Sequence, residues 1–196
     1  PQMECPSGAG IALKVSQALL NGEHGSFFDL AALGTLADSV ALKGENRTIV
    51  KEGLNSIREG RRAAVRALKE VSGLKARTIK AWTLCFTLVP RINAAGRLSD
   101  ASMAVELLLS DSEEAAMEMA ASLEKDNVRR QKIEEELLNE ALAKLGDGAD
   151  APSIALWGEG WHEGVIGIVA ARIAERCGRP AFVFSVKDGL AKGSAR

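Results

Sequence analysis

The stretch SIALWGEGWHEGVIGIVAARIAERCGRPAFVFS, at residues 153–185, decides the fold class of this 196-residue chain. It opens with a short apolar run that is typical of a buried strand, and a glycine-rich segment follows. Apolar residues then recur at helical spacing up to Gly178, and a second apolar run lies at residues 179–185. Strand, loop, helix and strand form a β-loop-α-β unit, and the right-handed crossover rule makes its strands parallel. The sequence therefore predicts an α/β fold class, with the sheet in the last third of the chain.

The chain before residue 111 is predicted to be mostly helical. Four segments carry apolar side chains at helical spacing: 11–20, 26–38, 46–60 and 61–73. Gly60 and Gly73 are placed to end the last two of these helices. A fifth helix, roughly 75–89, is the most apolar, and we expect it to end at Pro90 because proline cannot donate the next helical hydrogen bond. Residues 90–100, PRINAAGRLSD, are then expected to form a short loop before another helix.

A long helical pattern begins at Asp111 or Ser112 and runs to Leu145. Its apolar stripe is interrupted at EKDNVRRQK, residues 124–132. A helix that is apolar at both ends and polar in the middle suits a strut that joins two domains. A long surface helix with a solvated middle turn explains the pattern equally well, and both interpretations stay open.

Composition excludes several classes of protein. With 46% hydrophobic and 26% charged residues, the chain is an ordinary globular protein rather than a disordered one. Its longest apolar run lies within AWTLCFTLV, which is too short to span a bilayer, and no signal peptide is visible. We therefore expect a cytoplasmic protein without a membrane partner. Cys5, Cys85 and Cys177 lie far apart with no CxxC pair, which argues against a disulfide framework and a zinc site.

The net charge of -1 conceals an uneven distribution. Residues 43–97 hold 13 Lys and Arg against 4 Asp and Glu, whereas residues 99–150 hold 5 against 14. A basic block of this size could attract a polyanion such as a nucleic acid. Alternatively, the basic and acidic helices neutralise one another, and charge alone does not choose between the two.

Asp38 lies where its predicted helix ends. A carboxylate at this position meets the negative end of the helix dipole, which is unfavourable unless a cation offsets it. That cation could be a lysine or a divalent metal, for which carboxylate oxygen is a hard ligand. On the residues alone, a solvated terminal aspartate is the favoured interpretation.

The expected loop at 90–100 is rich in donors for an anion. Arg91 and Arg97 flank a predicted turn in which Asn93 and Gly96 tolerate left-handed backbone angles, so amide and guanidinium groups could converge on one phosphate. The alternative is a plain turn between helices, in which Arg97 pairs with Asp100.

Two further segments near the end of the chain could bind an anion. GEGWHEG, at residues 158–164, places glycines and His162 directly before a helix N-terminus, but the spacing fits neither a Rossmann fingerprint nor a P-loop. Trp161 and His162 could stack on a base or ribose, or His162 could contact a scissile phosphate; a buried Trp and a capping His are the alternative. KGSAR offers backbone approach, a hydroxyl and a guanidinium in a predicted Gly-Ser turn: Gly193, Ser194 and Arg196.

Six motifs occur in order: DLAALGTLADSVAL, GENR, PRINAAGRLSDA, DNVRRQ, GWHEGVIGIVAARIAERCGRPAFVF and KGSAR. Together they closely resemble the 5'-to-3' single-stranded-DNA exonucleases of the DHH phosphoesterase family, over nearly the whole chain. The resemblance implies three parts: the end of a DHH catalytic domain with a helical appendage at 1–110, an inter-domain connecting helix at 111–146, and the first half of a DHH-associated nucleic-acid-binding domain at 147–196.

The resemblance also implies site residues. Asp38 matches the aspartate of the family's fourth metal motif, which helps to hold a pair of Mn²⁺ or Mg²⁺ ions. Asn93 and Arg97 match the NAAGR motif that faces the nucleic acid, and His162 matches a histidine expected to be catalytic. The GS-x-R segment that grips the 5' phosphate is matched by Gly193, Ser194 and Arg196.

The departures from the family pattern are equally informative. The D-x-D motif, the second-motif aspartate and the Asp-His-His triplet are absent, and we expect them upstream of Pro1. The chain is therefore interpreted as an inactive internal fragment of a two-metal exonuclease of DNA repair and recombination, with single-stranded DNA as substrate and a helicase and a single-strand-binding protein as partners. Two alternatives remain: another DHH phosphodiesterase acting on short oligonucleotides or cyclic dinucleotides, and a non-catalytic nucleic-acid-binding module.

Overall fold

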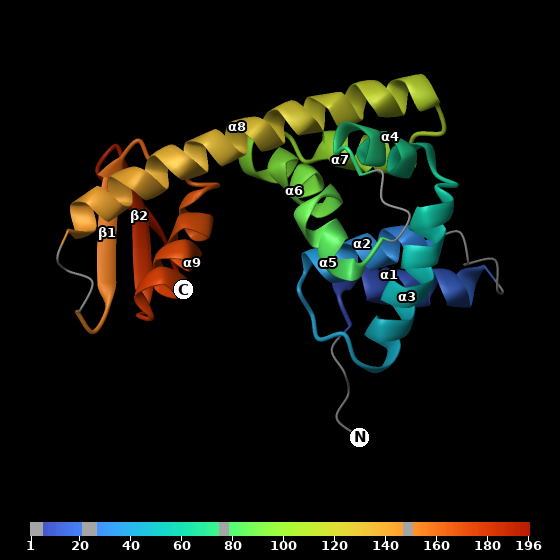
Figure 1. Ribbon diagram of the computed structural model, residues 1–196, viewed down its shortest axis with the longest axis horizontal. Coiled ribbons are helices and arrows are strands. Elements are labelled where there is room, and N and C mark those ends of the chain that lie inside the picture. The colour runs from blue at the N-terminus through green and yellow to red at the C-terminus, as the bar shows by residue number, and fades with distance from the viewer. Residues whose placement is uncertain (1–5, 21–26, 75–78, 147–150) are drawn as a thin grey trace. The chain divides into compact units, whose positions relative to one another are not determined.

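The computed structural model describes residues 6–20, 27–74, 79–146 and 151–196 (Figure 1). The chain divides into two compact units. The first, here called the helical unit, comprises residues up to Ala95 together with Asp100–Lys125. The second, the α/β unit, comprises Gly96–Ser99 and Asp126–Arg196. The division into three parts predicted from the resemblance stays a prediction.

The helical unit is built from α-helices, as the apolar spacing predicted. Their bounds are α1 Gly8–Leu19, α2 Phe28–Ala37, α3 Gly44–Glu59, α4 Ala63–Val71, α5 Ala81–Phe86, α6 Leu88–Leu98, α7 Ser102–Leu109 and α8 Glu113–Leu145. Gly60 ends α3 with a left-handed backbone angle of φ 64°, and Gly73 adopts φ 65° just after α4. Both predicted helix ends are confirmed, because glycine has no Cβ to clash in this conformation.

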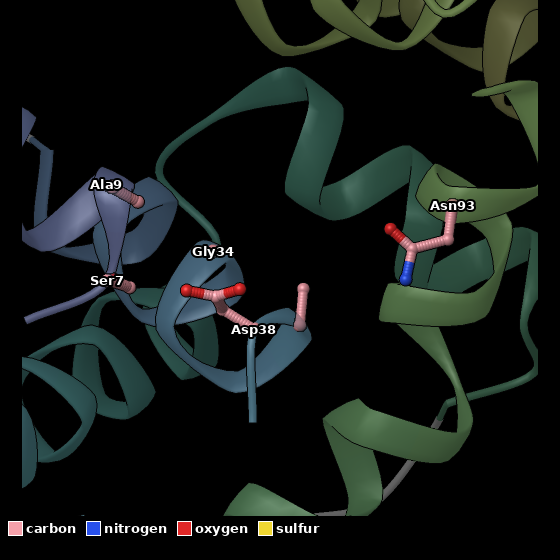
Figure 2. A pocket seen from close by; sticks show the side chains of 7 residues that line it. Ser7, Ala9, Gly34, Asp38 and Asn93 are labelled. Atoms are coloured by element: carbon pink, nitrogen blue, oxygen red, sulfur yellow. The ribbon is translucent and has the colours of Figure 1, made fainter. Parts of the chain in front are cut away.

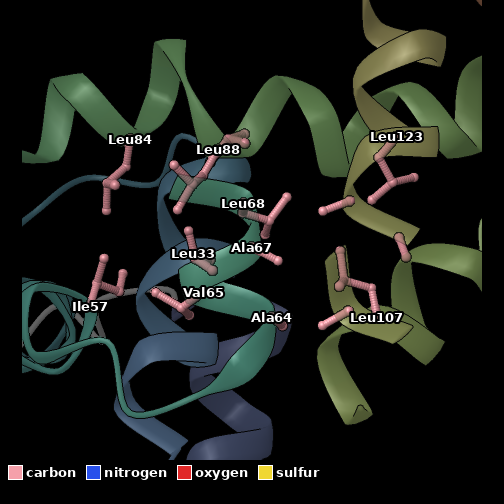
Figure 3. Close-up of a cluster of buried hydrophobic side chains, with 14 of the residues drawn as sticks. Leu33, Ile57, Ala64, Val65, Ala67, Leu68, Leu84, Leu88, Leu107 and Leu123 are labelled. Atoms are coloured by element: carbon pink, nitrogen blue, oxygen red, sulfur yellow. The ribbon is translucent and has the colours of Figure 1, made fainter. Parts of the chain in front are cut away.

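The core of the helical unit gathers buried side chains from α2 to α8 (Figure 3). Burying each large aliphatic side chain contributes about 1.5–3 kcal/mol to stability. Because these helices meet in one cluster, their termini hold fixed positions relative to one another within the unit. The largest members of the cluster are Ile57, Leu68, Leu84, Leu88, Leu107 and Leu123.

The predicted loop at 90–100 is wrong, because residues up to Leu98 are helical. The break falls earlier, at Thr87 (φ -113°, ψ -78°), and α6 begins at Leu88. Pro90 is then the third residue of the new helix, where a missing N–H costs nothing because first-turn N–H groups have no intrahelical partner. Asn93 and Gly96 consequently have no left-handed angles, so the anion-binding turn predicted here does not form. The start of the fifth predicted helix, residues 75–78, lies outside the described residues.

Helix α8 runs without interruption from Glu113 to Leu145 and contributes to both units. Its early part buries Ala116, Ala120 and Leu123 in the core of the helical unit. Its later part adds Leu137 and Ala141 to the core of the α/β unit. The polar stretch between these parts is not simply solvated, because Asn127 and Glu134 are buried.

The α/β unit holds a three-stranded sheet in the order β1-β2-β3. Strands β1 (Ile154–Glu159) and β2 (Ala181–Lys187) are parallel, and α9 (Ile166–Cys177) connects them. Alternate strand residues face α9 and are buried, among them Ile154, Leu156 and Val183. The predicted α/β fold class and parallel β-loop-α-β unit are confirmed.

The predicted Gly-Ser turn is a strand. β3, Leu190–Ala195, pairs antiparallel with β2 and includes Gly193 and Ser194. The turn lies earlier, at Asp188 (φ 51°) and Gly189 (φ 75°), where both residues adopt the positive φ that a two-residue hairpin requires. Asp-Gly is a strong hairpin signal, so the sequence contained the information that this prediction missed.

The described helices include none with the length and apolar character needed to cross a bilayer.

Candidate nucleic-acid interface

In the helical unit, Asp38 and Asn93 line one open hollow of about 380 Å³ (Figure 2). The end of α2 supplies Asp38 and α6 supplies Asn93, whose amide points to the side on which Asp38 lies. The start of α1 contributes Ser7, which caps that helix by accepting a hydrogen bond from the backbone N–H of Gly10 at 3.0 Å. The structure therefore brings together two of the residues singled out in the sequence.

Asp38 is the C-cap of α2, as predicted. Its backbone N–H donates to the carbonyl of Gly34 at 3.0 Å, and the chain turns away at Ser39 with φ 53°. Its side chain is exposed, and no ion pair or hydrogen bond to its carboxylate is found within the described part of the chain. Among the described residues, no cation offsets this carboxylate at the negative end of α2.

In the α/β unit, candidate residues gather at the first turn of α9. Arg97 Nη1 donates to the carbonyl of Gly164 at 3.0 Å. Gly164 has no room for a side chain, because a Cβ there would lie 2.3 Å from the carbonyl oxygen of Arg97. The alternative pairing of Arg97 with Asp100 is not observed; Asp100 instead accepts at 2.9 Å from the backbone N–H of Ser102, the first residue of α7.

His162 accepts hydrogen bonds from backbone N–H groups at the start of α9 and directly before it. Its carbonyl accepts from the N–H groups of Val165 at 2.9 Å and Ile166 at 3.1 Å. Its Nδ1 accepts from the N–H of Gly164 at 3.1 Å. A neutral imidazole that accepts at Nδ1 carries its proton on Nε2, so His162 has an Nε2–H to offer another acceptor.

The end of β3 reaches the same turn. A Cβ on Gly167 would lie 3.1 Å from Ser194 Oγ and 3.8 Å from Arg196 Nη2. The sheet register sets this position, because Ser194 pairs with Val183 and Gly193 pairs with Phe184. Gly193 is required here, since a Cβ would overlap the Phe184 ring at 2.4 Å. Among the described residues, no acceptor is found for the backbone N–H of Gly167.

We call the set Arg97, His162, Gly167, Ser194 and Arg196 the α9 N-terminal group. Its cations influence one another: the pKa of Arg97 is lowered, first by partial burial of the guanidinium and then by the charges of Arg130 and Arg196, whereas the Glu134 carboxylate raises it. The nearby Glu163 forms an ion pair with Lys192, whose Nζ lies 2.7 Å from Glu163 Oε2. The hydrogen bond from Lys192 lowers the pKa of Glu163. The group therefore combines guanidinium, hydroxyl, imidazole and backbone N–H donors.

Two sequence interpretations change. Trp161 is 6% exposed and its Nε1 donates to Glu140 Oε2 at 2.9 Å, so the alternative of a buried Trp is correct and base stacking is excluded. Arg91 is paired with Glu124 on α8 and also donates to the carbonyl of Thr87, so it is not part of the α9 N-terminal group.

Sequence reasoning did not anticipate Gly164 and Gly167, although close approach of another backbone is a common reason for glycine at such a position.

The described residues do not complete a metal site. No cluster of three or more His, Cys, Asp or Glu side chains that could hold a metal is present among them. Asp38 offers one suitable oxygen donor, and Asn93 across the hollow offers an amide. One carboxylate cannot assemble a two-metal centre, so no reaction step follows from this chain's residues alone.

The comparisons with known proteins point to one class, the single-stranded-DNA-specific exonucleases. The chain is 39% identical over 193 residues to RecJ of Bacillus subtilis, with 97% of this chain and 25% of that protein covered. It is 43% identical over 175 residues to RecJ of Escherichia coli, with 86% and 30% covered. The chain thus spans a quarter to a third of the length of these relatives. No family model matches it.

Solved structures agree. RecJ from Thermus thermophilus in complex with Mn²⁺ superimposes with a TM-score of 0.85 and 40% identity, covering 93% of this chain and 28% of that one. An exonuclease RecJ bound to manganese gives a TM-score of 0.85 and 38% identity, covering 100% of this chain and 50% of that one. The resemblance predicted from the six motifs is confirmed: the chain is similar to RecJ over nearly its whole length.

Proposed function

We propose that this chain is a segment of a RecJ-type 5'-to-3' single-stranded-DNA exonuclease, and that its α9 N-terminal group binds the phosphate at the 5' end of the strand. One observation carries the proposal. Ser194 Oγ and Arg196 Nη2 both lie within 4 Å of the position that a Cβ on Gly167 would occupy, next to an N–H with no hydrogen bond among the described residues.

The chemistry of the group suits a phosphate. The start of a helix carries a partial positive charge and N–H groups that need an acceptor. Arginine adds a planar fork that donates two parallel hydrogen bonds to phosphate oxygens. Arg97 on α6 and Arg196, directly after β3, supply this fork, and Ser194 on β3 supplies a hydroxyl. His162 would donate from its Nε2–H to the scissile phosphate, in the catalytic role expected for this histidine.

The hydrolytic chemistry belongs to the metal centre. In a RecJ-type enzyme, a pair of Mn²⁺ or Mg²⁺ ions would generate hydroxide and stabilise charge on the attacked phosphate. Asp38 would serve as one of the metal ligands, and Asn93 would face the DNA from the same hollow. Because the described residues hold no complete ligand set, we expect the chain alone to bind DNA without cutting it.

Wider roles follow from the same proposal. The setting would be DNA repair and recombination, in the cytoplasm, with a helicase and a single-strand-binding protein as partners. The alternatives, a phosphodiesterase for short oligonucleotides or cyclic dinucleotides and a non-catalytic module, are not favoured, because the relatives carry the name of single-stranded-DNA-specific exonucleases.

The proposal is tested by equilibrium binding. Two fluorescent oligothymidylates of equal length, one with a 5' phosphate and one with a 5' hydroxyl, are titrated with the chain and followed by anisotropy. We expect tighter binding of the phosphorylated strand, and Arg196→Ala should reduce this preference. Equal affinity of the unsubstituted chain for both strands would contradict the proposed role of the α9 N-terminal group.

A further inference from the structure

The polar middle of α8 contains a buried carboxylate that the proposed function does not use. Glu134 has a side chain only 3% exposed, and it forms ion pairs with two arginines. Oε1 lies 2.7 Å from Nη2 of Arg172 on α9, and Oε2 pairs with Nη1 of Arg130, one turn earlier on α8. Arg130 is fixed further, because its Nη2 donates to Asn127 Oδ1 at 2.8 Å.

Stability of the fold alone does not favour a buried carboxylate at this position. Burying a carboxylate costs several kcal/mol even when it is paired, and apolar residues of similar size often serve a core equally well or better. The neighbouring core positions on the same face of α8, Leu137 and Ala141, are apolar. A charged residue at Glu134 therefore points to a requirement other than packing.

The requirement is found at the α9 N-terminal group. A phosphate site gathers cations, and before DNA arrives these cations repel one another. Arg97 lies within electrostatic reach of Arg130 and Arg196, and their charges lower its pKa, whereas Glu134 raises it. Asp126, at the start of the same α8 segment, accepts a hydrogen bond from Ser99 Oγ at 2.8 Å and so ties α8 to the end of α6.

We propose that Glu134 is a positioning residue for the phosphate site: through Arg172 it holds α9 against α8, to which Ser99 ties the end of α6, so that Arg97 stays directed at the first turn of α9. The inference rests on the proposed function of that turn. Glu134 does not touch the DNA; it acts through the arginines. Removing its charge leaves Arg130 and Arg172 without their anion and releases α9 from α8, so we expect the hydrogen bond from Arg97 to Gly164 to weaken.

The test compares Glu134→Gln with Glu135→Gln. Both changes remove one negative charge from α8, but Glu135 is exposed and has no ion pair among the described residues. For each protein, the dissociation constants of the 5'-phosphorylated and 5'-hydroxyl oligothymidylates are measured in the same sample. Their ratio is independent of the folded fraction, since both strands report on the same folded molecules, so a merely structural role would not change it.

We expect Glu134→Gln to reduce the 5'-phosphate preference by roughly threefold to tenfold, which is the size of one weakened charged hydrogen bond. Glu135→Gln should retain the full preference. Glu134→Asp should restore part of it, because a shorter carboxylate still pairs with one arginine. If Glu134→Gln does not fold, Arg172→Gln replaces it: Arg172 is 57% exposed, and its loss removes the ion pair that holds α9 to Glu134, which again lowers the preference.

The outcomes separate the two proposals. If the unsubstituted chain shows no 5'-phosphate preference, the proposed function and the role of Glu134 fail together. If the unsubstituted chain shows the preference and Glu134→Gln or its substitute retains it in full, the role of Glu134 alone is refuted.

Discussion

Gly167→Ala separates binding from stability at the α9 N-terminal group. Gly167 is the second residue of α9 and has no positive φ, so alanine fits its backbone. The new methyl would lie 3.1 Å from Ser194 Oγ, which is a few tenths of an ångström too close, and the serine side chain can move by that amount. Alanine is favoured over glycine in a helix by at most about 1 kcal/mol. The free energy of unfolding should therefore stay level or rise.

Binding should change in the opposite direction. The methyl occupies the space beside Ser194 and Arg196 in which the proposed phosphate would accept hydrogen bonds. Loss of one hydrogen bond to a charged group costs about 1.5 kcal/mol, or roughly tenfold in affinity. We expect the 5'-phosphate preference, measured by anisotropy, to fall by about this factor while the unfolding midpoint in urea is retained.

The matched control is Gly10→Ala in α1. A Cβ on Gly10 meets its nearest neighbours at an ordinary 3.4 Å, so the same helix gain is expected without any effect on the 5' end. A Gly167→Ala protein that is fully stable and still prefers the 5'-phosphorylated strand by the original factor would refute the reasoning.

Three further predictions follow from the same geometry. Gly164→Ala places a Cβ 2.3 Å from the carbonyl oxygen of Arg97, a backbone atom that cannot move aside, so urea unfolding should show a loss of about 1–3 kcal/mol; an unchanged midpoint would contradict the close approach. Arg97→Ala should weaken DNA binding and reduce the slope of log affinity against log salt by about 0.7, and an unaltered slope across a salt series would count against a phosphate contact. The hydrogen bond from Trp161 is the main cause of the lowered pKa of Glu140. The stability that this bond contributes is therefore fully present above the ordinary glutamate pKa of about 4.3, and it is lost as the pH falls through the lowered pKa. The stability difference between the unsubstituted chain and Trp161→Phe should therefore narrow below about pH 4, and a constant difference would argue against this bond.

Sequence patterns predicted the parts of the fold that depend on local chemistry. The apolar runs around α9 gave the parallel β-loop-α-β unit, and Gly60 and Gly178 ended their helices in left-handed conformations. The error at Pro90 has a physical cause. Proline ends a helix or begins one, and only the break at Thr87, which carries no sequence signal, decides between the two.

For the candidate site, too, the sequence predicted residues but not the contacts between them. The motifs located Asp38, Arg97 and Ser194 in the chain, but they did not reveal the contacts that each of these residues makes. The approach of β3 to Gly167 depends on the hairpin register, and the Glu134 ion pairs depend on which face of α8 meets α9. Such contacts join residues far apart in sequence, so periodicity and spacing do not reveal them.

The most direct test of the central claim is the amide resonance of Gly167 in a ¹⁵N-labelled chain. The account predicts that a 5'-phosphorylated oligothymidylate shifts this resonance strongly, because the phosphate accepts a hydrogen bond from that N–H, and that a 5'-hydroxyl strand shifts it far less. Equal shifts with both strands, or no shift with either, would contradict a 5'-phosphate site at the start of α9.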